Sequence, residues 1–96
     1  MDDKGNAAIT VRVLVTGRVQ GVGYRYACAE QAHARALAGW VRNLPDGRVE
    51  ALLQGAEDSV RAVLGWMKDG PELARVDDLS VTPDSGAAPF PFQVQK

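Results

Sequence analysis

The sequence is short of the residues from which metal sites and disulfides are built: its 96 residues include one cysteine and one histidine. The lone Cys28 excludes an intrachain disulfide and a metal site made from paired cysteines, and it is interpreted as a small buried side chain. The polar start, residues 1–6, is not followed by the apolar segment of a signal peptide, and no apolar run reaches membrane-spanning length. These features predict a cytoplasmic location and no metal or cofactor.

The sequence also lacks an excess of charge of either sign. Eleven Lys and Arg residues oppose twelve Asp and Glu residues, which gives a formal net charge of −1. This balance argues against nucleic acid as a partner and against a polybasic membrane anchor. The length predicts a single domain over residues 1–96, with residues 1–7 flexible, and nothing in the sequence requires more than a monomer.

The pattern of apolar residues predicts a regular alternation of strands and helices. Apolar residues at period two, bounded by Gly and Pro turns, predict strands over residues 9–16, 39–43, 48–54 and 74–82, and a short edge strand over 90–94. Good helix formers predict helices over 24–37 and 56–68. The second helix has the clearer apolar face, formed by Val60, Val63, Leu64 and Met67. In the first, the face consists of Tyr24, Cys28 and Ala32, widened by Ala27.

The order of these elements matches the ferredoxin-like β-α-β-β-α-β arrangement of the α+β class, with two helices on one face of an antiparallel sheet. A bulge is expected near Asp77 and Asp78, where the alternation breaks. In this topology the first two strands run parallel, with the third strand between them. Their carboxyl ends therefore meet at one edge of the sheet, about 10 Å apart.

A glycine-rich loop lies at that edge. Three glycines fall within residues 17–23, directly before the helix that is expected to start at Tyr24. Such a turn leaves unpaired N–H groups and the positive end of the helix dipole at one spot, which is a natural site for phosphate. Arg25 falls in the first helical turn, where a cation is disfavoured by about 0.3–1 kcal/mol unless it binds an anion together with the amides. The alternatives are a tight connection and a solvated arginine.

Asn43 ends the second predicted strand and so lies on the same edge. One interpretation is a residue that initiates the turn ahead of Pro45, Asp46 and Gly47. The other is a neutral amide that faces the phosphate site and orients a water molecule without repelling an anion.

Two stretches of the sequence resemble the acylphosphatase signatures. Residues 17–25 read Gly-Arg-Val-Gln-Gly-Val-Gly-Tyr-Arg, and residues 39–43 read Gly-Trp-Val-Arg-Asn. The resemblance covers about residues 9–95. It implies hydrolysis of the carboxyl–phosphate bond of acyl phosphates, with Arg25 binding the phosphate and Asn43 orienting the attacking water. The backbone amides that it implies in phosphate binding are those of Gln20, Gly21, Val22, Gly23 and Tyr24.

This small set of groups suits an activated substrate. An acyl phosphate expels a carboxylate whose conjugate acid has a pKa of about 4–5, so the leaving group needs no proton. Positioning and charge stabilisation can then suffice, without a metal. Inorganic phosphate or sulfate is expected to be able to occupy the same site.

Two other function classes are alternatives to hydrolysis. RNA-recognition domains share the order of elements, but their third strand carries stacking aromatics, whereas residues 48–54 contain none. A regulatory module that binds phosphate or an acyl phosphate without turnover remains the alternative. Two departures from the family pattern are Ala36, where Gly is common at the end of the first helix, and Leu44, where some members carry a hydroxyl residue.

Overall fold

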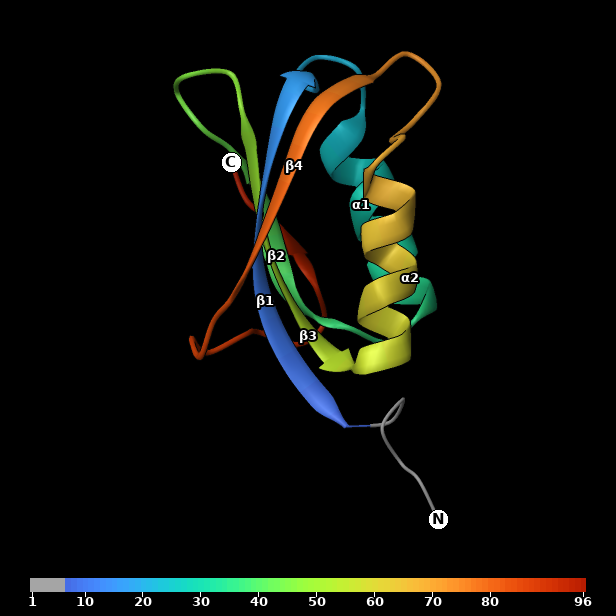
Figure 1. Ribbon diagram of the computed structural model, residues 1–96, viewed down its shortest axis with the longest axis vertical. Helices are drawn as coiled ribbons and strands as arrows, with labels where there is room; N and C mark the ends of the chain where they lie inside the picture. The colour runs from blue at the N-terminus through green and yellow to red at the C-terminus, as the bar shows by residue number, and fades with distance from the viewer. Residues whose placement is uncertain (1–6) are drawn as a thin grey trace.

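The computed structural model describes residues 7–96, so the segment expected to be flexible, residues 1–7, lies outside the described residues except for Ala7. Its elements alternate much as the sequence predicts (Figure 1). In chain order they are β1 (Ala8–Arg18), α1 (Tyr24–Ala34), β2 (Ala38–Asn43), β3 (Val49–Ala56), α2 (Glu57–Met67), β4 (Arg75–Pro83) and β5 (Gln93–Val94). Both helices cover the same face of the sheet, which confirms the ferredoxin-like α+β architecture.

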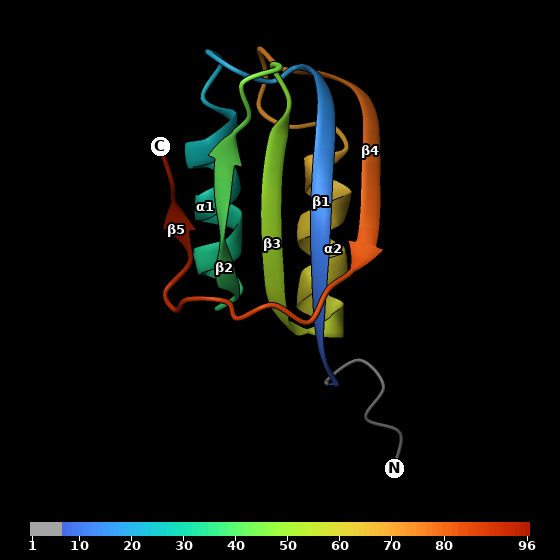
Figure 2. The same ribbon diagram turned by 90° about the vertical axis from the view of Figure 1, so that its left-hand side faces the viewer.

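The five strands lie in the order β4-β1-β3-β2-β5 (Figure 2). β3 pairs antiparallel with β1 and with β2, so β1 and β2 run in the same direction on either side of it, as expected. β5 pairs parallel with β2, which makes the sheet mixed at this edge.

The C-terminal edge strand is shorter than predicted. Only Gln93 and Val94 pair with β2. Phe92 is buried against the core whereas Phe90 is 68% exposed, so these two aromatics do not share a face. The predicted alternation from Phe90 onward is therefore wrong, because Phe90 lies outside the paired segment.

A hydrophobic core fills the space between the sheet and the helices. α2 contributes Val60, Val63 and Met67, as its periodicity predicts, while Leu64 is half-buried. In α1 the fourth buried residue is Ala29, and the predicted Ala27 is only half-buried. Burying a side chain such as Val or Met stabilises the fold by about 1.5–3 kcal/mol. The remaining core residues come mainly from the strands and include Val13, Val15, Val41, Val49, Ala51 and Leu53.

Two irregularities affect the end of the sheet that carries the glycine-rich loop. β1 continues through Gly17 and Arg18, two residues further than predicted, and pairs there with β4. The register shifts where Thr16 pairs with Asp78 and Gly17 pairs with Val76, which confirms the expected bulge. Bulges increase local twist, so this one redirects the chain as it enters the loop.

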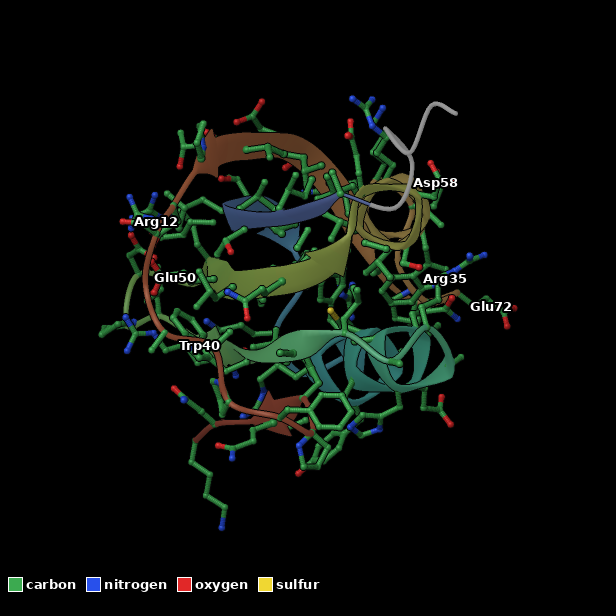
Figure 3. All side chains as sticks on the ribbon, turned by 90° about the horizontal axis from the view of Figure 1, so that it is seen from below. Arg12, Arg35, Trp40, Glu50, Asp58 and Glu72 are labelled. Atoms are coloured by element: carbon green, nitrogen blue, oxygen red, sulfur yellow. The ribbon has the colours of Figure 1, made fainter. Side chains whose placement is uncertain are left out.

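The other face of the sheet carries a polar cluster instead of helices (Figure 3). Glu50 is 5% exposed and accepts hydrogen bonds from Arg12 Nη1 at 2.9 Å and Arg42 Nε at 2.8 Å. Arg42 also lies 4.9 Å from the centre of the Trp40 ring. A buried carboxylate must be paired to be tolerated, and this one is paired twice.

Among residues 7–96, no helix is both long enough and apolar enough to cross a membrane.

Candidate active site

Two loops meet at one edge of the sheet because β1 and β2 run parallel. Residues 19–23, here called the anion loop, connect β1 to α1, and residues 44–48, the hairpin loop, connect β2 to β3. Both lie at the top of the view in Figure 2. The topology predicted from the sequence therefore brings the two candidate regions together.

The anion loop exposes backbone donors at the start of α1. Gly21 and Gly23 have φ angles of 75° and 79°, a left-handed conformation that costs glycine little and other residues more. The first helical hydrogen bond runs from the Ala27 N–H to the Gly23 carbonyl, so the N–H groups of residues 24–26 have no partner within the helix. Among residues 7–96, no side chain forms a capping hydrogen bond at the start of α1. Its N–H groups and dipole are therefore free to receive an anion.

A pocket of about 200 Å³ lies between the anion loop, the start of α1 and Asn43 at the end of β2. Five of the predicted site residues line it: Gly21, Gly23, Tyr24, Arg25 and Asn43. Val19 and Tyr26 also line it and were not predicted. Tyr26 is 63% exposed, and the only signal for it in the sequence is its position next to Arg25.

The other two predicted residues lie beside the pocket. Val22 is half-buried and packs against the core. The Gln20 side chain turns towards the hairpin loop, where its Nε2 donates to the carbonyls of Leu44 and Arg48 at 2.8 and 3.0 Å. Any contact of these two residues with a ligand is therefore left to their backbone amides.

Arg25 is held at the pocket by the C-terminal segment. Its Nη1 donates to the Gln95 carbonyl at 2.8 Å, and the Gln95 N–H in turn donates to the Val41 carbonyl of β2. The Arg25 Cζ also lies 5.8 Å from the centre of the Tyr26 ring. A guanidinium has five N–H donors, so this tether leaves most of them for an anion. Sequence reasoning missed Gln95, because only the pairing of β5 with β2 brings it here.

Asn43 lines the pocket from β2, whereas the other lining residues belong to the anion loop and to α1. It is the last residue of β2 and pairs with Val49 of β3, which fixes its backbone. Its Oδ1 atom is buried and has no hydrogen-bond partner among residues 7–96. Buried polar atoms are nearly always satisfied, and an exception in a pocket marks a place where a bound molecule can supply the missing bond.

Tyr24 lines the pocket but is mainly a structural anchor. It is 1% exposed, its hydroxyl donates to the Met67 carbonyl at 2.8 Å, and its ring lies 5.6 Å from that of Trp66. Burial raises the pKa of this hydroxyl, so it remains protonated. It thereby joins the start of α1 to the end of α2.

The cysteine and the histidine lie away from the pocket. Cys28 is fully buried, as predicted, and burial raises the pKa of its thiol to about 12, which leaves it unreactive. His33 is exposed, and its Nε2 lies 2.8 Å from the Phe92 carbonyl. A second hollow of about 300 Å³ borders His33, but its other walls are Ala36, Leu37, Phe90 and Pro91. It offers an anion no guanidinium, unlike the pocket at Arg25.

Comparisons with known proteins agree with this geometry. The acylphosphatase family model matches residues 11–93. "Acylphosphatase 2" of Ralstonia nicotianae is 54% identical over 89 residues, covering 90% of this chain and 94% of that relative. The crystal structure of acylphosphatase from Bacillus subtilis superimposes with a TM-score of 0.87 at 40% identity, covering 92% of this chain and 99% of that one. HypF of T. kodakarensis, 31% identical with a TM-score of 0.73, matches 90% of this chain with 12% of its own.

Proposed function

The chain belongs to the acylphosphatase family and is a hydrolase of acyl phosphates, and on that premise we propose how its residues perform the reaction. Arg25 and the backbone amides of residues 20–25 bind the phosphate group. Asn43 holds the attacking water. Gln20 and Val22 contact the phosphate only through their backbone amides, whereas Tyr24 also fixes the start of α1. The reaction uses no metal and no cofactor.

The position of Arg25 supports its role. A guanidinium beside free N–H groups can bind two phosphate oxygens in a fork, which is the strong, oriented form of this interaction. The bond to the Gln95 carbonyl restrains the side chain before the substrate arrives. A preorganised arginine loses less conformational freedom on binding, so more of its interaction energy stabilises the transition state.

The unpartnered Oδ1 atom of Asn43 is the observation that carries the proposal. A water molecule beside the phosphate can donate one hydrogen bond to this atom and direct a lone pair at phosphorus. The amide is neutral, so it accepts this bond without repelling the dianion. No residue that lines the pocket is acidic, which suits an anionic substrate.

The reaction follows from these positions. The oxygen of the water attacks phosphorus while the bond from phosphorus to the carboxylate oxygen breaks in line with it. Both protons of the water stay with the phosphate product, one on the new oxygen and one on a phosphoryl oxygen. The bond electrons leave with the carboxylate, whose conjugate acid has a pKa of about 4–5, so no acid is required to protonate it. The loop amides and Arg25 stabilise the charge on the three phosphoryl oxygens. No covalent phosphoenzyme forms.

The same residues define the ligands that we propose. Inorganic phosphate, the product, binds the same pocket, and sulfate can replace it.

We also propose an assembly state and a location. The protein acts as a single monomeric domain over residues 1–96, in the cytoplasm, without nucleic acid or membrane. These assignments are supported by the near-neutral charge, the lone cysteine and the absence of a long apolar run in the sequence.

A non-catalytic phosphate-binding module is the second candidate function. The structural match to HypF of T. kodakarensis supports it. The match covers only 12% of the HypF chain, so in HypF this fold forms part of a much larger protein. Such a module would bind phosphate at the same pocket without turnover.

Phosphate release from acetyl phosphate and benzoyl phosphate tests the proposal. Turnover is expected to be equal with and without excess chelator. Loss of turnover with chelator would overturn the metal-independent reaction. Binding of inorganic phosphate without turnover of either substrate would instead favour the regulatory module.

A further inference from the structure

The side chain of Gln20 connects the two loops at the end of the sheet where the pocket lies. It belongs to the anion loop, but its Nε2 donates to two carbonyls of the hairpin loop, those of Leu44 at 2.8 Å and Arg48 at 3.0 Å. An amide side chain has only two N–H donors, so both are used on this one loop. The residue is half-buried, which makes the loss of either bond more costly than at an exposed position.

The two accepting carbonyls also close the hairpin loop on itself. The Leu44 N–H donates to the Arg48 carbonyl at 2.8 Å, and the Gly47 N–H donates to the Leu44 carbonyl at 3.1 Å. Gln20 therefore binds the loop at its two closing points. Any shift of the hairpin loop relative to the anion loop must break at least one of the bonds to Gln20.

Asn43 is the residue immediately before this loop. Its Oδ1 atom has no hydrogen-bond partner among the described residues, so no such bond to that oxygen holds the side chain in place. Its position depends on the backbone of β2 and on the first residue of the hairpin loop, Leu44, which Gln20 binds.

We propose that Gln20 is a positioning residue that sets Asn43 at the correct distance from the bound phosphate. Its side chain does not touch the substrate. It holds the anion loop, which binds the phosphate, against the hairpin loop, which directly follows Asn43. This inference rests on the proposed function, because it concerns the geometry of the same reaction. It predicts that losing the side-chain amide impairs the attack of water more than the binding of phosphate.

Kinetics of Gln20→Met test the proposal, since methionine has a similar length but no donor. We expect kcat with benzoyl phosphate to fall about 10-fold, while KM and the inhibition constant of inorganic phosphate stay within about twofold, because a 1 Å error in position can cost up to a hundredfold in rate. Gln20→Asn, which keeps the amide but shortens its reach, is expected to behave alike and serves if Gln20→Met does not fold. Unchanged kcat in a folded variant, or a rise in KM that accounts for the whole effect, would overturn the inference.

Gln54→Met is the matched control. Gln54 also uses its side-chain amide to join two segments, donating to Thr10 Oγ1 at 2.9 Å between β3 and β1, but it lies outside the pocket. We expect wild-type kcat for this variant. A loss equal to that of Gln20→Met would show a general effect of removing a half-buried side-chain amide and would overturn the positioning role.

The double variant Gln20→Met with Asn43→Ala separates coupling from independent damage. If Gln20 acts through Asn43, kcat of the double variant equals that of Asn43→Ala within about twofold. A further tenfold loss in the double variant would contradict the inference. If the wild-type protein itself releases no phosphate from either substrate, the proposed function fails instead, and this outcome is separate from any result on Gln20.

Discussion

The two helices have the same length and cover the same face of the sheet, but their starts differ. α2 carries Glu57 and Asp58 in its first turn, where negative charge complements the helix dipole. The described first turn of α1 carries no acidic residue and contains Arg25, a cation at the positive end of the dipole. α2 thus begins with its charge balanced by its own residues, whereas α1 leaves a surplus of positive potential in the pocket.

Their ends differ as well. After α2 the chain turns at Gly70, whose φ of 71° suits a residue without a side chain. After α1 the same left-handed turn is made by Ala36, with a φ of 55°, and the Leu37 N–H closes it by donating to the Ala32 carbonyl. Alanine in this conformation costs about 1 kcal/mol relative to glycine. The left-handed φ of Ala36 explains why glycine is common at this position in the family that the sequence resembles.

Two residues of this region are unfavourable for a helix: Arg25 at the start of α1 and Ala36 just after its end. At the start of α1 the unfavourable residue lines a pocket, together with a buried oxygen that has no partner. At the end of α1 the unfavourable residue borders a different hollow, lined by His33 and by apolar side chains. We therefore expect changes at the first position to alter activity and changes at the second to alter stability.

The largest expected effect is that of Arg25→Gln. Removing the guanidinium should lower kcat/KM for benzoyl phosphate on the order of 10³-fold, because a charged, bidentate phosphate contact is lost. Stability should fall little, since the cation is unfavourable at a helix start. Arg61→Gln in α2 is the control, because Arg61 is exposed and pairs with Glu57. An equal loss of kcat/KM in both variants would show that the start of α1 has no special role in phosphate binding.

Asn43→Ala comes next. The water loses its acceptor, so kcat should fall on the order of 10²-fold. Binding of inorganic phosphate, measured by calorimetry, should remain within about twofold, because the amides and Arg25 are intact. Wild-type kcat in this variant would show that Asn43 does not orient the water.

Ala36→Gly is expected to stabilise the protein. Relief of the left-handed strain should raise the free energy of unfolding by about 0.5–1 kcal/mol, measured by urea denaturation, with unchanged kcat. A loss of activity would connect this helix end to the pocket after all.

Glu57→Gln should have the smallest effect. The variant loses a charge that complements the dipole of α2, and the hydrogen bond from Arg61 Nε, 2.8 Å long in the wild-type protein, loses its charged acceptor. We expect a decrease of about 0.5 kcal/mol in the free energy of unfolding and no change in kcat. A larger fall at low than at high salt would confirm the electrostatic cause, whereas salt-independent loss would point to packing.

Much of this arrangement could be predicted from the sequence, because its signals are local. The periodic apolar faces of β1 and α2, and the glycines of the anion loop, indicated the order of elements, and the topology then brought Arg25 and Asn43 to one edge. Two contacts at the site could not be predicted. The bond from Arg25 to Gln95 depends on a strand of two residues, whose pairing has no periodic signal. The bonds from Gln20 depend on where two loop carbonyls point, which only the folded backbone decides.

The position of β3 between β1 and β2 has a consequence for how activity returns after denaturation. The helices form from neighbouring residues, but the pocket exists only after strands far apart along the chain have joined. Long-range pairing of this kind is slower than helix formation. A helix of 11 residues is marginal in water on its own, so α1 and α2 become stable only when they pack on the sheet. The helical signal and catalysis are therefore expected to return together during refolding, when the sheet is complete.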